Sequence, residues 1–164
     1  MNNQIKFLMV FTFLFTCSLS AQTGYQLLSE QITFSIPDDW QITKDPENLM
    51  LEAVNATGTI KVTIWEVPVD FETVLFTNGE GIGFDYQIAD VGDYKKTEIS
   101  AFDAAISDLK GISNSDNEEY RILSVIYKLE ESLTATFKAE ISSNATSKEI
   151  KQAEKIAYTV QNMK

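Results

Sequence analysis

The amino-acid sequence predicts an α+β domain whose sheet is mostly antiparallel. Two observations carry this prediction. Several short segments alternate apolar and polar residues with a period of two, as half-buried strands do, and the chain closes with an amphipathic helix that has its own start signal. Residues 22–164 have the length of one domain with one core, and no repeat or linker divides them. We therefore expect a single domain over 22–164.

The first strands are predicted near the start of this domain. Residues 31–36 alternate strictly, which places three large apolar side chains on one face. Residues 37–39, Pro-Asp-Asp, then form a turn, and Trp40 resumes the alternation. A second strand is predicted over 49–54, and it is followed by a turn in which Gly58 can adopt positive φ.

The strand signal over 59–67 is the clearest in the chain. Its residues are apolar on one face and half apolar on the other, so we expect a central strand that is covered on both sides. Pro68 ends it, and Asp70 can cap a short helix over 71–76. Residues 79–94 are rich in Gly and Asp, which predicts a loop, and their length makes this loop the best candidate for a binding loop.

The second half of the domain is predicted to be a hairpin followed by a helix. Before it, residues 102–110 have both helical and strand spacing, so the pattern leaves their structure open. Residues 120–127 and 133–141 alternate as a hairpin pair does. Thr146 and Glu149 then have the spacing of a capping box, in which each side chain bonds the other residue's backbone N–H, at the start of the closing helix.

Residues 1–21 have the layout of a secretory signal peptide. Lys6 supplies the positive charge, 7–15 form an apolar stretch too short to span a bilayer, and small residues precede a cut after Ala21. We therefore expect a periplasmic or secreted protein. Cys17 leaves one alternative open, because a lipoprotein signal also ends at a Cys and would anchor the chain to lipid.

The composition of the mature chain argues against several classes of function. Cleavage would remove Lys6 and no acidic residue, which changes the net charge from −11 to −12 and argues against binding nucleic acid or anionic membranes. The chain has no His, and its only Cys lies in the predicted signal, so triads based on His and thiol nucleophiles are excluded. Carboxylate chemistry, acid–base chemistry by Lys or Tyr, and a Ser–Lys pair remain. We expect no enzyme activity and no cofactor.

Two motifs invite a ligand-binding interpretation. The run Gly79-Glu80-Gly81-Ile82-Gly83 superficially resembles a phosphate-binding loop, but it follows a predicted helix, whereas such loops follow a strand and open a helix. Acidic residues that could offer oxygens to Ca²⁺ form two sets, which are Asp85, Asp90 and Asp93, and Asp116, Glu118 and Glu119. Neither set has the spacing of a calcium loop, so we interpret both as solvated charge and predict no metal site.

Asp38-Asp39-Trp40 is the most distinctive short run. Paired carboxylates beside an aromatic ring could bind a sugar or act as acid and base. Adjacent strand residues point to opposite faces, however, so the two carboxylates need not meet at one substrate. We interpret the run as a turn followed by a core Trp, and we predict no catalytic residue.

The order of motifs resembles the PsbP-like domain, which is named for the extrinsic subunit of the photosynthetic oxygen-evolving complex. Phe34-Ser35-Ile36-Pro37 followed by Asp39-Trp40 is similar to the opening of that domain, although Asp39 replaces its usual Gly. Residues 99–105 fit its hairpin corner, and 157–160 fit the end of its terminal helix. The resemblance implies an antiparallel sheet of about six or seven strands with helices on both faces, an α/β/α sandwich. It also favours a strand over 103–110.

The resemblance carries no catalytic residues, and known members of the family look like assembly or binding factors. Together with the missing residue types, it predicts a non-enzymatic accessory or binding domain of the cell envelope. Contacts with another envelope protein would be made along a sheet edge or through the 79–94 loop. Two alternatives are a carboxylate-based hydrolase of envelope glycans and a carrier of a small apolar ligand.

Overall fold

The computed structural model describes residues 22–26, 31–88 and 93–163. The predicted signal peptide over 1–21, including Cys17, lies outside this part. The strands and helices follow in the order β1 (Gln22–Gln26), β2 (Ile32–Pro37), β3 (Gln41–Asp45), β4 (Met50–Val54), β5 (Ile60–Val67), α1 (Phe71–Asp85), β6 (Tyr86–Ile88), β7 (Lys95–Ile99), β8 (Phe102–Ser113), β9 (Glu119–Glu130), β10 (Leu133–Ser142), α2 (Ser147–Tyr158) and β11 (Gln161–Asn162).

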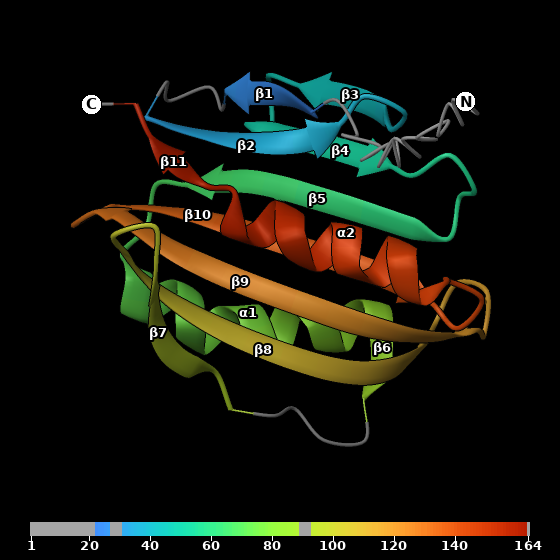
Figure 1. Cartoon of the computed structure of the whole chain (residues 1–164). Coiled ribbons are helices and arrows are strands. Elements are labelled where there is room, and N and C mark those ends of the chain that lie inside the picture. The colour runs from blue at the N-terminus through green and yellow to red at the C-terminus, as the bar shows by residue number, and fades with distance from the viewer. Residues whose placement is uncertain (1–21, 27–30, 89–92, 164) are drawn as a thin grey trace, which may run out of the picture.

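The described strands form two antiparallel sheets (Figure 1). The large sheet has the order β3-β4-β5-β10-β9-β8-β6, and β7 also pairs with β8. The small sheet has the order β1-β2-β11. The antiparallel α+β architecture is as predicted, but the described strands exceed the six or seven expected: the large sheet has eight, and β1, β2 and β11 form a separate sheet of three.

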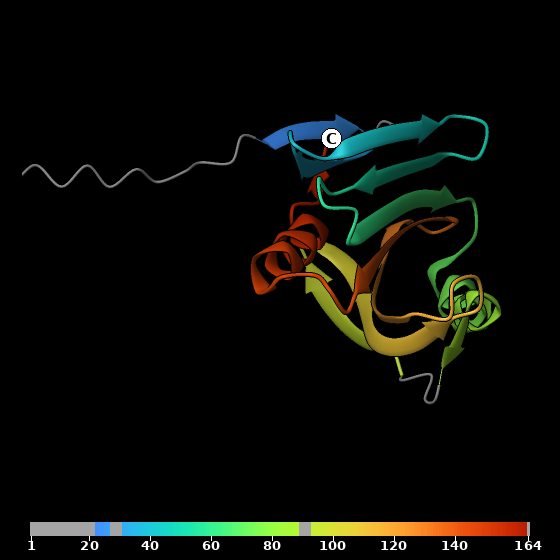
Figure 2. The ribbon, with the colours of Figure 1, turned by 90° about the vertical axis from the view of Figure 1, so that its right-hand side faces the viewer.

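The side chains of β9 alternate between two cores. Leu123, Val125 and Tyr127 belong to the main core with residues of α2 and β2, whereas Ile126 packs with Phe71 of α1. Figure 2 shows α1 and α2 on different sides of the curved sheet. The layer beside α2 also contains β2, so the arrangement is not the simple sandwich of helices on both faces that we expected. The short α2 covers only part of that face, and β2 covers more of it.

The predicted loop over 79–94 is wrong in its first part. α1 continues to Asp85 and is followed directly by β6; residues 89–92 lie outside the described part. The helix continues because Ile82 is 3% exposed and packs with Leu109 and Ile122 of the sheet. Burial of an apolar side chain thus outweighs the low helix propensity of the Gly residues around it.

Three local predictions are confirmed. The spacing over 102–110 left helix and strand open, and the strand that the family resemblance favoured over 103–110 is present within β8. β7 and β8 meet at a hairpin corner in which Ile99 pairs with Phe102, and both intervening residues have positive φ, 51° at Ser100 and 68° at Ala101. The capping box at Thr146 and Glu149 is formed and starts α2.

Candidate functional site

A polar hollow lies at the end of the large sheet where β5 begins and β8 turns into β9. It consists of two adjoining cavities of about 240 and 410 Å³ that share Lys61, Tyr86, Ser113, Ser115 and Glu140. We call it the Glu140 pocket. The other residues that line it are Gly58, Thr59, Asp85, Asn114, Asp116, Tyr120 and Lys138.

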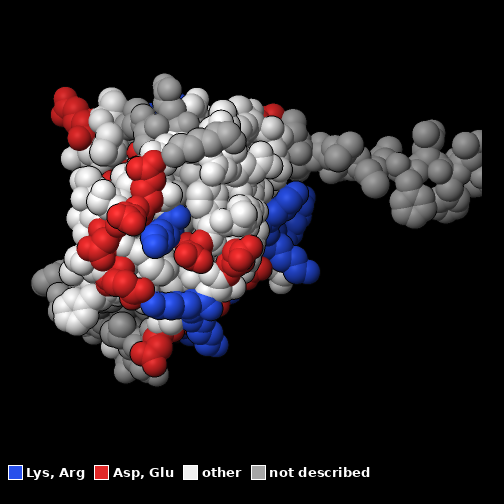
Figure 3. Space-filling model, turned by 90° about the vertical axis from the view of Figure 1, so that its left-hand side faces the viewer, with Lys and Arg blue, Asp and Glu red and all other residues white. Residues whose placement is uncertain are grey.

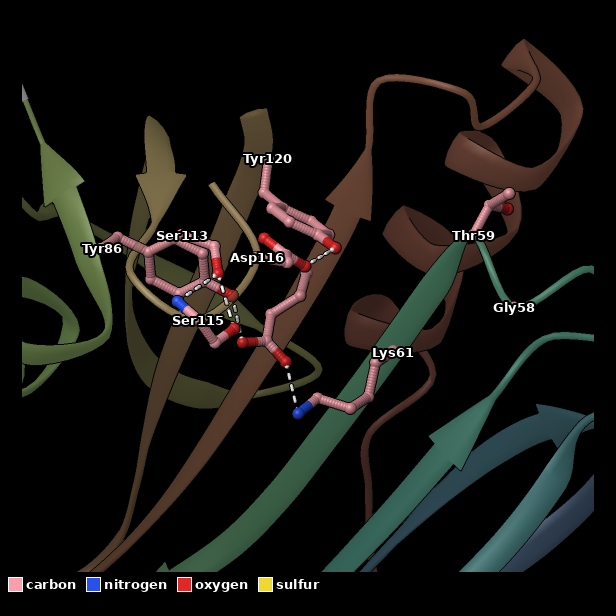
Figure 4. Close-up of a pocket in the computed structure, with 9 residues that line it drawn as sticks. Gly58, Thr59, Lys61, Tyr86, Ser113, Ser115, Asp116 and Tyr120 are labelled. Carbon is pink, nitrogen blue, oxygen red and sulfur yellow. Dashed lines mark hydrogen bonds and ion pairs between the residues drawn. The ribbon is translucent and has the colours of Figure 1, made fainter. Parts of the chain in front are cut away.

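Sheet register brings the charged residues of the pocket together. Lys138 and Glu140 lie two residues apart on β10, so they share a face. Lys61 stands directly opposite Glu140 on the neighbouring β5. Tyr86 enters from the other side because α1 ends at Asp85 and the next residue is already extended, with φ −134°. In Figure 4, Lys61 points from β5 toward the side of the pocket that holds Tyr86.

Glu140 is the centre of a closed network of ion pairs and hydrogen bonds. Its side chain is 9% exposed. Lys61 Nζ lies 2.9 Å from Oε2, Lys138 Nζ lies 3.3 Å from Oε1, and the Tyr86 hydroxyl donates a hydrogen bond to Oε1. Burial raises the pKa of Glu140, but Lys138, Lys61 and Tyr86 together outweigh it and hold the pKa below its ordinary value. Glu140 is therefore ionised at neutral pH.

The turn between β8 and β9 forms the rim of the pocket. Asp116 accepts a hydrogen bond from the backbone N–H of Glu118 at 3.0 Å and another from the Tyr120 hydroxyl at 2.9 Å. These bonds lower the pKa of Asp116. The Tyr120 ring meets the Tyr86 ring edge-on, with 6.0 Å between their centroids. The two rings supply the aromatic surface of the pocket.

The resolved pKa shifts of the pocket residues all point away from neutral pH. The pKa of Tyr86 is raised, first by burial and then by Glu140, and the pKa of Tyr120 is raised by its bond to Asp116. The pKa of Lys61 is also raised, because the pairing with Glu140 outweighs its burial. A general acid or base works best with a pKa near neutral pH. All five shifts at the pocket move pKa values away from it, Glu140 and Asp116 downward and the other three upward.

The Asp38-Asp39-Trp40 motif lies away from this pocket. Asp38 and Asp39 are exposed in the turn between β2 and β3, and the Asp38 carboxylate accepts a hydrogen bond of 2.6 Å from the Thr23 hydroxyl. Trp40 is 5% exposed and belongs to the main core. The structure thus places these residues as a turn followed by a core Trp, in agreement with our interpretation.

The Gly-rich motif has a different structure from the one we expected, whereas the described residues of both acidic sets are exposed, as solvated charges are. Residues 79–83 lie within α1, so they are neither a phosphate loop nor the flexible loop of our interpretation. Asp85 lines the Glu140 pocket and lies 3.6 Å from Lys138 Nζ, whereas Asp93 is exposed and Asp90 lies outside the described part. Over the residues that the structure describes, no three His, Cys, Asp or Glu side chains are grouped as a metal site would need.

Sequence reasoning missed the pocket residues Lys61, Lys138, Glu140, Tyr86 and Tyr120. A signal was present in the strand over 133–141. Its even-numbered positions are Thr134, Thr136, Lys138 and Glu140, so the face opposite the apolar one carries four polar residues. In a sheet expected to be covered on both sides, such a polar face predicts buried polar contacts.

The fold is shared with solved structures, although no family model matches the sequence and no curated protein matches it. Cyanobacterial PsbP (CyanoP) from Synechocystis sp. PCC 6803 aligns with a TM-score of 0.61 and 8% identity, over 88% of this chain and 94% of its own. LpqN, involved in cell envelope biogenesis of Mycobacterium tuberculosis, aligns with a TM-score of 0.57 and 14% identity, over 87% of this chain and 90% of its own.

A third structure comes from Bacteroides thetaiotaomicron VPI-5482. It aligns with a TM-score of 0.56 and 13% identity over 89% of this chain, and the chain spans about half (50%) of that protein's length. The PsbP-like fold suggested by the sequence motifs is thereby confirmed. Within the described residues, no helix combines the length and the apolar character that a membrane span requires.

Proposed function

We propose that the chain is a non-enzymatic binding or accessory domain that is exported to the cell envelope and contacts another envelope protein there. The observation that carries this proposal is the closed network around Glu140. The carboxylate at the centre of the pocket is engaged by two ammonium groups and a phenol, so it holds the pocket together and is not free to exchange protons with a substrate.

The fold supports the location. LpqN is involved in cell envelope biogenesis and shares this fold, and the N-terminal residues have the layout of an export signal. The likeness at 14% identity establishes a shared fold, and the envelope role proposed for this chain takes its support from that fold together with the export-signal layout.

The two alternatives receive less support. Asp38 and Asp39, the carboxylates proposed for a glycan hydrolase, are exposed on a turn and do not line the Glu140 pocket. An apolar carrier needs an apolar cavity, whereas charged residues and hydroxyls make up most of the lining of the Glu140 pocket.

Two surface features are candidates for contact with a partner protein. Phe76 of α1 is 79% exposed, which is unusual for a large apolar side chain on a helix whose other described apolar residues are buried or half-buried. β3 is the edge strand of the large sheet, and an edge can pair with a strand of another protein. These two places replace the predicted 79–94 loop as the surfaces to test.

Site-specific photocrosslinking in the native cells tests the proposal. A benzophenone amino acid is placed at Phe76, at Gln41 in the edge strand β3 or at Tyr158 of α2, in the full chain with a C-terminal tag. We expect a discrete adduct with one envelope protein from Phe76 or Gln41 and none from Tyr158, which serves as an exposed aromatic control. The absence of adducts at every position, together with a purified chain that cleaves envelope glycan and loses this activity in Glu140→Gln, would contradict the proposal.

A further inference from the structure

We infer that the Glu140 pocket is a binding site for a neutral, hydroxyl-rich ligand, a saccharide of one or two rings. The inference rests on the proposed function in one respect: it treats the pocket as a site that binds a ligand without converting it. It concerns a small ligand, whereas the proposed function concerns a protein partner, so each can fail without the other.

The charges of the pocket argue for a neutral ligand. Lys61 and Lys138 are both paired with Glu140, and Lys138 also lies 3.6 Å from Asp85. An anionic ligand would compete with the buried Glu140 carboxylate for these ammonium groups, and a cationic ligand would compete with the ammonium groups for Glu140. A neutral ligand can bind without disturbing these ion pairs.

The acidic surface also argues against an acidic saccharide. The chain has a net charge of −11. The acidic character is not confined to the pocket, because Figure 3, which faces the opposite end of the molecule, shows Asp and Glu side chains in a band there. Such a field repels polyanions before they reach the pocket. Among saccharides, the neutral ones therefore have the best access.

Hydrogen-bonding capacity at the pocket suits vicinal hydroxyls. The Lys61 side chain is 45% exposed, and its ammonium has three donors, of which Glu140 takes the closest contact. On the rim, the Asp116 carboxylate accepts bonds from Glu118 and Tyr120, and a carboxylate offers about four acceptor positions. A sugar hydroxyl both donates and accepts, so adjacent hydroxyls can use a carboxylate acceptor and an ammonium donor together.

The size and the aromatic surface of the pocket point to the same class of ligand. Its two cavities measure about 240 and 410 Å³, the first just below and the second in the lower part of the roughly 300–1,000 Å³ found for small-molecule sites. Tyr86 and Tyr120 both line the smaller cavity, and their rings offer an apolar surface beside the polar groups. Sugar rings present C–H groups between their hydroxyls, so they can use both kinds of surface.

Titration of the purified full chain tests this inference. The probes are glucose, galactose, N-acetylglucosamine, maltose and cellobiose, with glycine as a zwitterion and inorganic phosphate as an anion. Binding is followed by backbone amide NMR shifts. We expect saturable shifts with at least one saccharide, centred on Gly58, Ser115 and Asp116, and no such shifts with glycine or phosphate.

Two variants and a matched control locate the binding. Lys61→Met keeps the side-chain stem and removes the ammonium. Tyr120→Phe removes a rim hydroxyl that donates to Asp116 and whose oxygen can still accept a hydrogen bond from a sugar hydroxyl. Each should weaken saccharide binding by about 2–10-fold, the effect of one hydrogen bond. Tyr158→Phe removes an exposed hydroxyl from α2 and should bind like the native chain. NMR spectra of the free variants show that each is folded.

Three results would overturn the inference: no saccharide of the panel binds, glycine or phosphate binds in preference, or folded Lys61→Met and Tyr120→Phe chains both bind the saccharide as tightly as the native chain.

Discussion

A buried hydroxyl on β10 offers a sharp test of the packing described above. Thr134 and Thr136 lie on the same face of this strand, and both are 0% exposed. The Thr134 hydroxyl donates a hydrogen bond of 2.8 Å to the carbonyl of Val69. Among the described residues, the Thr136 hydroxyl has no hydrogen-bond partner. The same substitution at the two positions should therefore have opposite effects on the free energy of unfolding.

Thr136→Val should stabilise the chain. A buried polar group without a partner costs about 1–3 kcal/mol, and the methyl that replaces the hydroxyl adds about 0.8 kcal/mol of apolar burial. Val is also β-branched, so the strand propensity hardly changes. We expect a gain of about 1–2 kcal/mol. Thr134→Val should cost about 1 kcal/mol, because it leaves the Val69 carbonyl without its donor and regains only the methyl burial.

Urea unfolding followed by far-UV circular dichroism measures both values, with thermal unfolding as a check. A change of 1 kcal/mol corresponds to roughly 2–4 °C in Tm for a domain of about this size. An unchanged m-value would show that the variants alter stability and not the unfolded state. If Thr136→Val destabilises the chain as much as Thr134→Val does, then the Thr136 hydroxyl has a partner and the reasoning is refuted.

Three further predictions concern other parts of the fold. Ala101→Gly should stabilise the β7–β8 corner by about 0.5–1 kcal/mol, because Gly adopts the positive φ of 68° without a Cβ penalty; a loss in urea unfolding would contradict this. Hydroxyls of Thr146 and Thr57 lower the pKa of Glu149 from 4.5 to about 2, so its contribution to stability is complete above pH 4.5 and is lost as the pH falls toward 2. The stability difference between the native chain and Glu149→Gln should therefore shrink over that range in acid titrations, and a constant difference would refute it. Tyr127→Phe removes a buried hydroxyl that donates a 2.6 Å hydrogen bond to a backbone carbonyl of α2. It should lower the free energy of unfolding by about 1–2 kcal/mol in the same urea assay, and an unchanged free energy would contradict this.

Strands could be predicted from the sequence wherever one face of the strand packs against a hydrophobic core. The alternation over 31–36, 59–67 and 133–141 follows from burial on one face, so local sequence carries the information. The length of α1 was not predictable in this way. Its second half is rich in Gly and is helical because Ile82 packs on the sheet, and that contact depends on strands that come later in the chain.

The pocket was less predictable than the fold. The shared face of Lys138 and Glu140 follows from strand periodicity, but their partners do not. Lys61 reaches Glu140 through the register of two strands that are far apart in the sequence, and Tyr86 reaches it across 54 residues because α1 ends just before it. Sequence periodicity shows which face of a strand a residue occupies. It does not show which residue from a distant part of the chain lies opposite.

The small sheet has a consequence for when the chain can fold. β2 lies between β1 and β11, and the backbone N–H of Met163 bonds the carbonyl of Gln31, so one of the first strands is held by the last described residues. β5 likewise requires β10 as its neighbour. A chain emerging from the ribosome or from a translocation channel can form the β8–β9–β10 meander through short turns. The pairing of β2 with β11 and its packing against α2, however, must wait until residues 147–162 have emerged. Until those residues emerge, Ile32, Phe34 and Ile36 lack the part of their core that α2 supplies, and a chain in that state is open to aggregation.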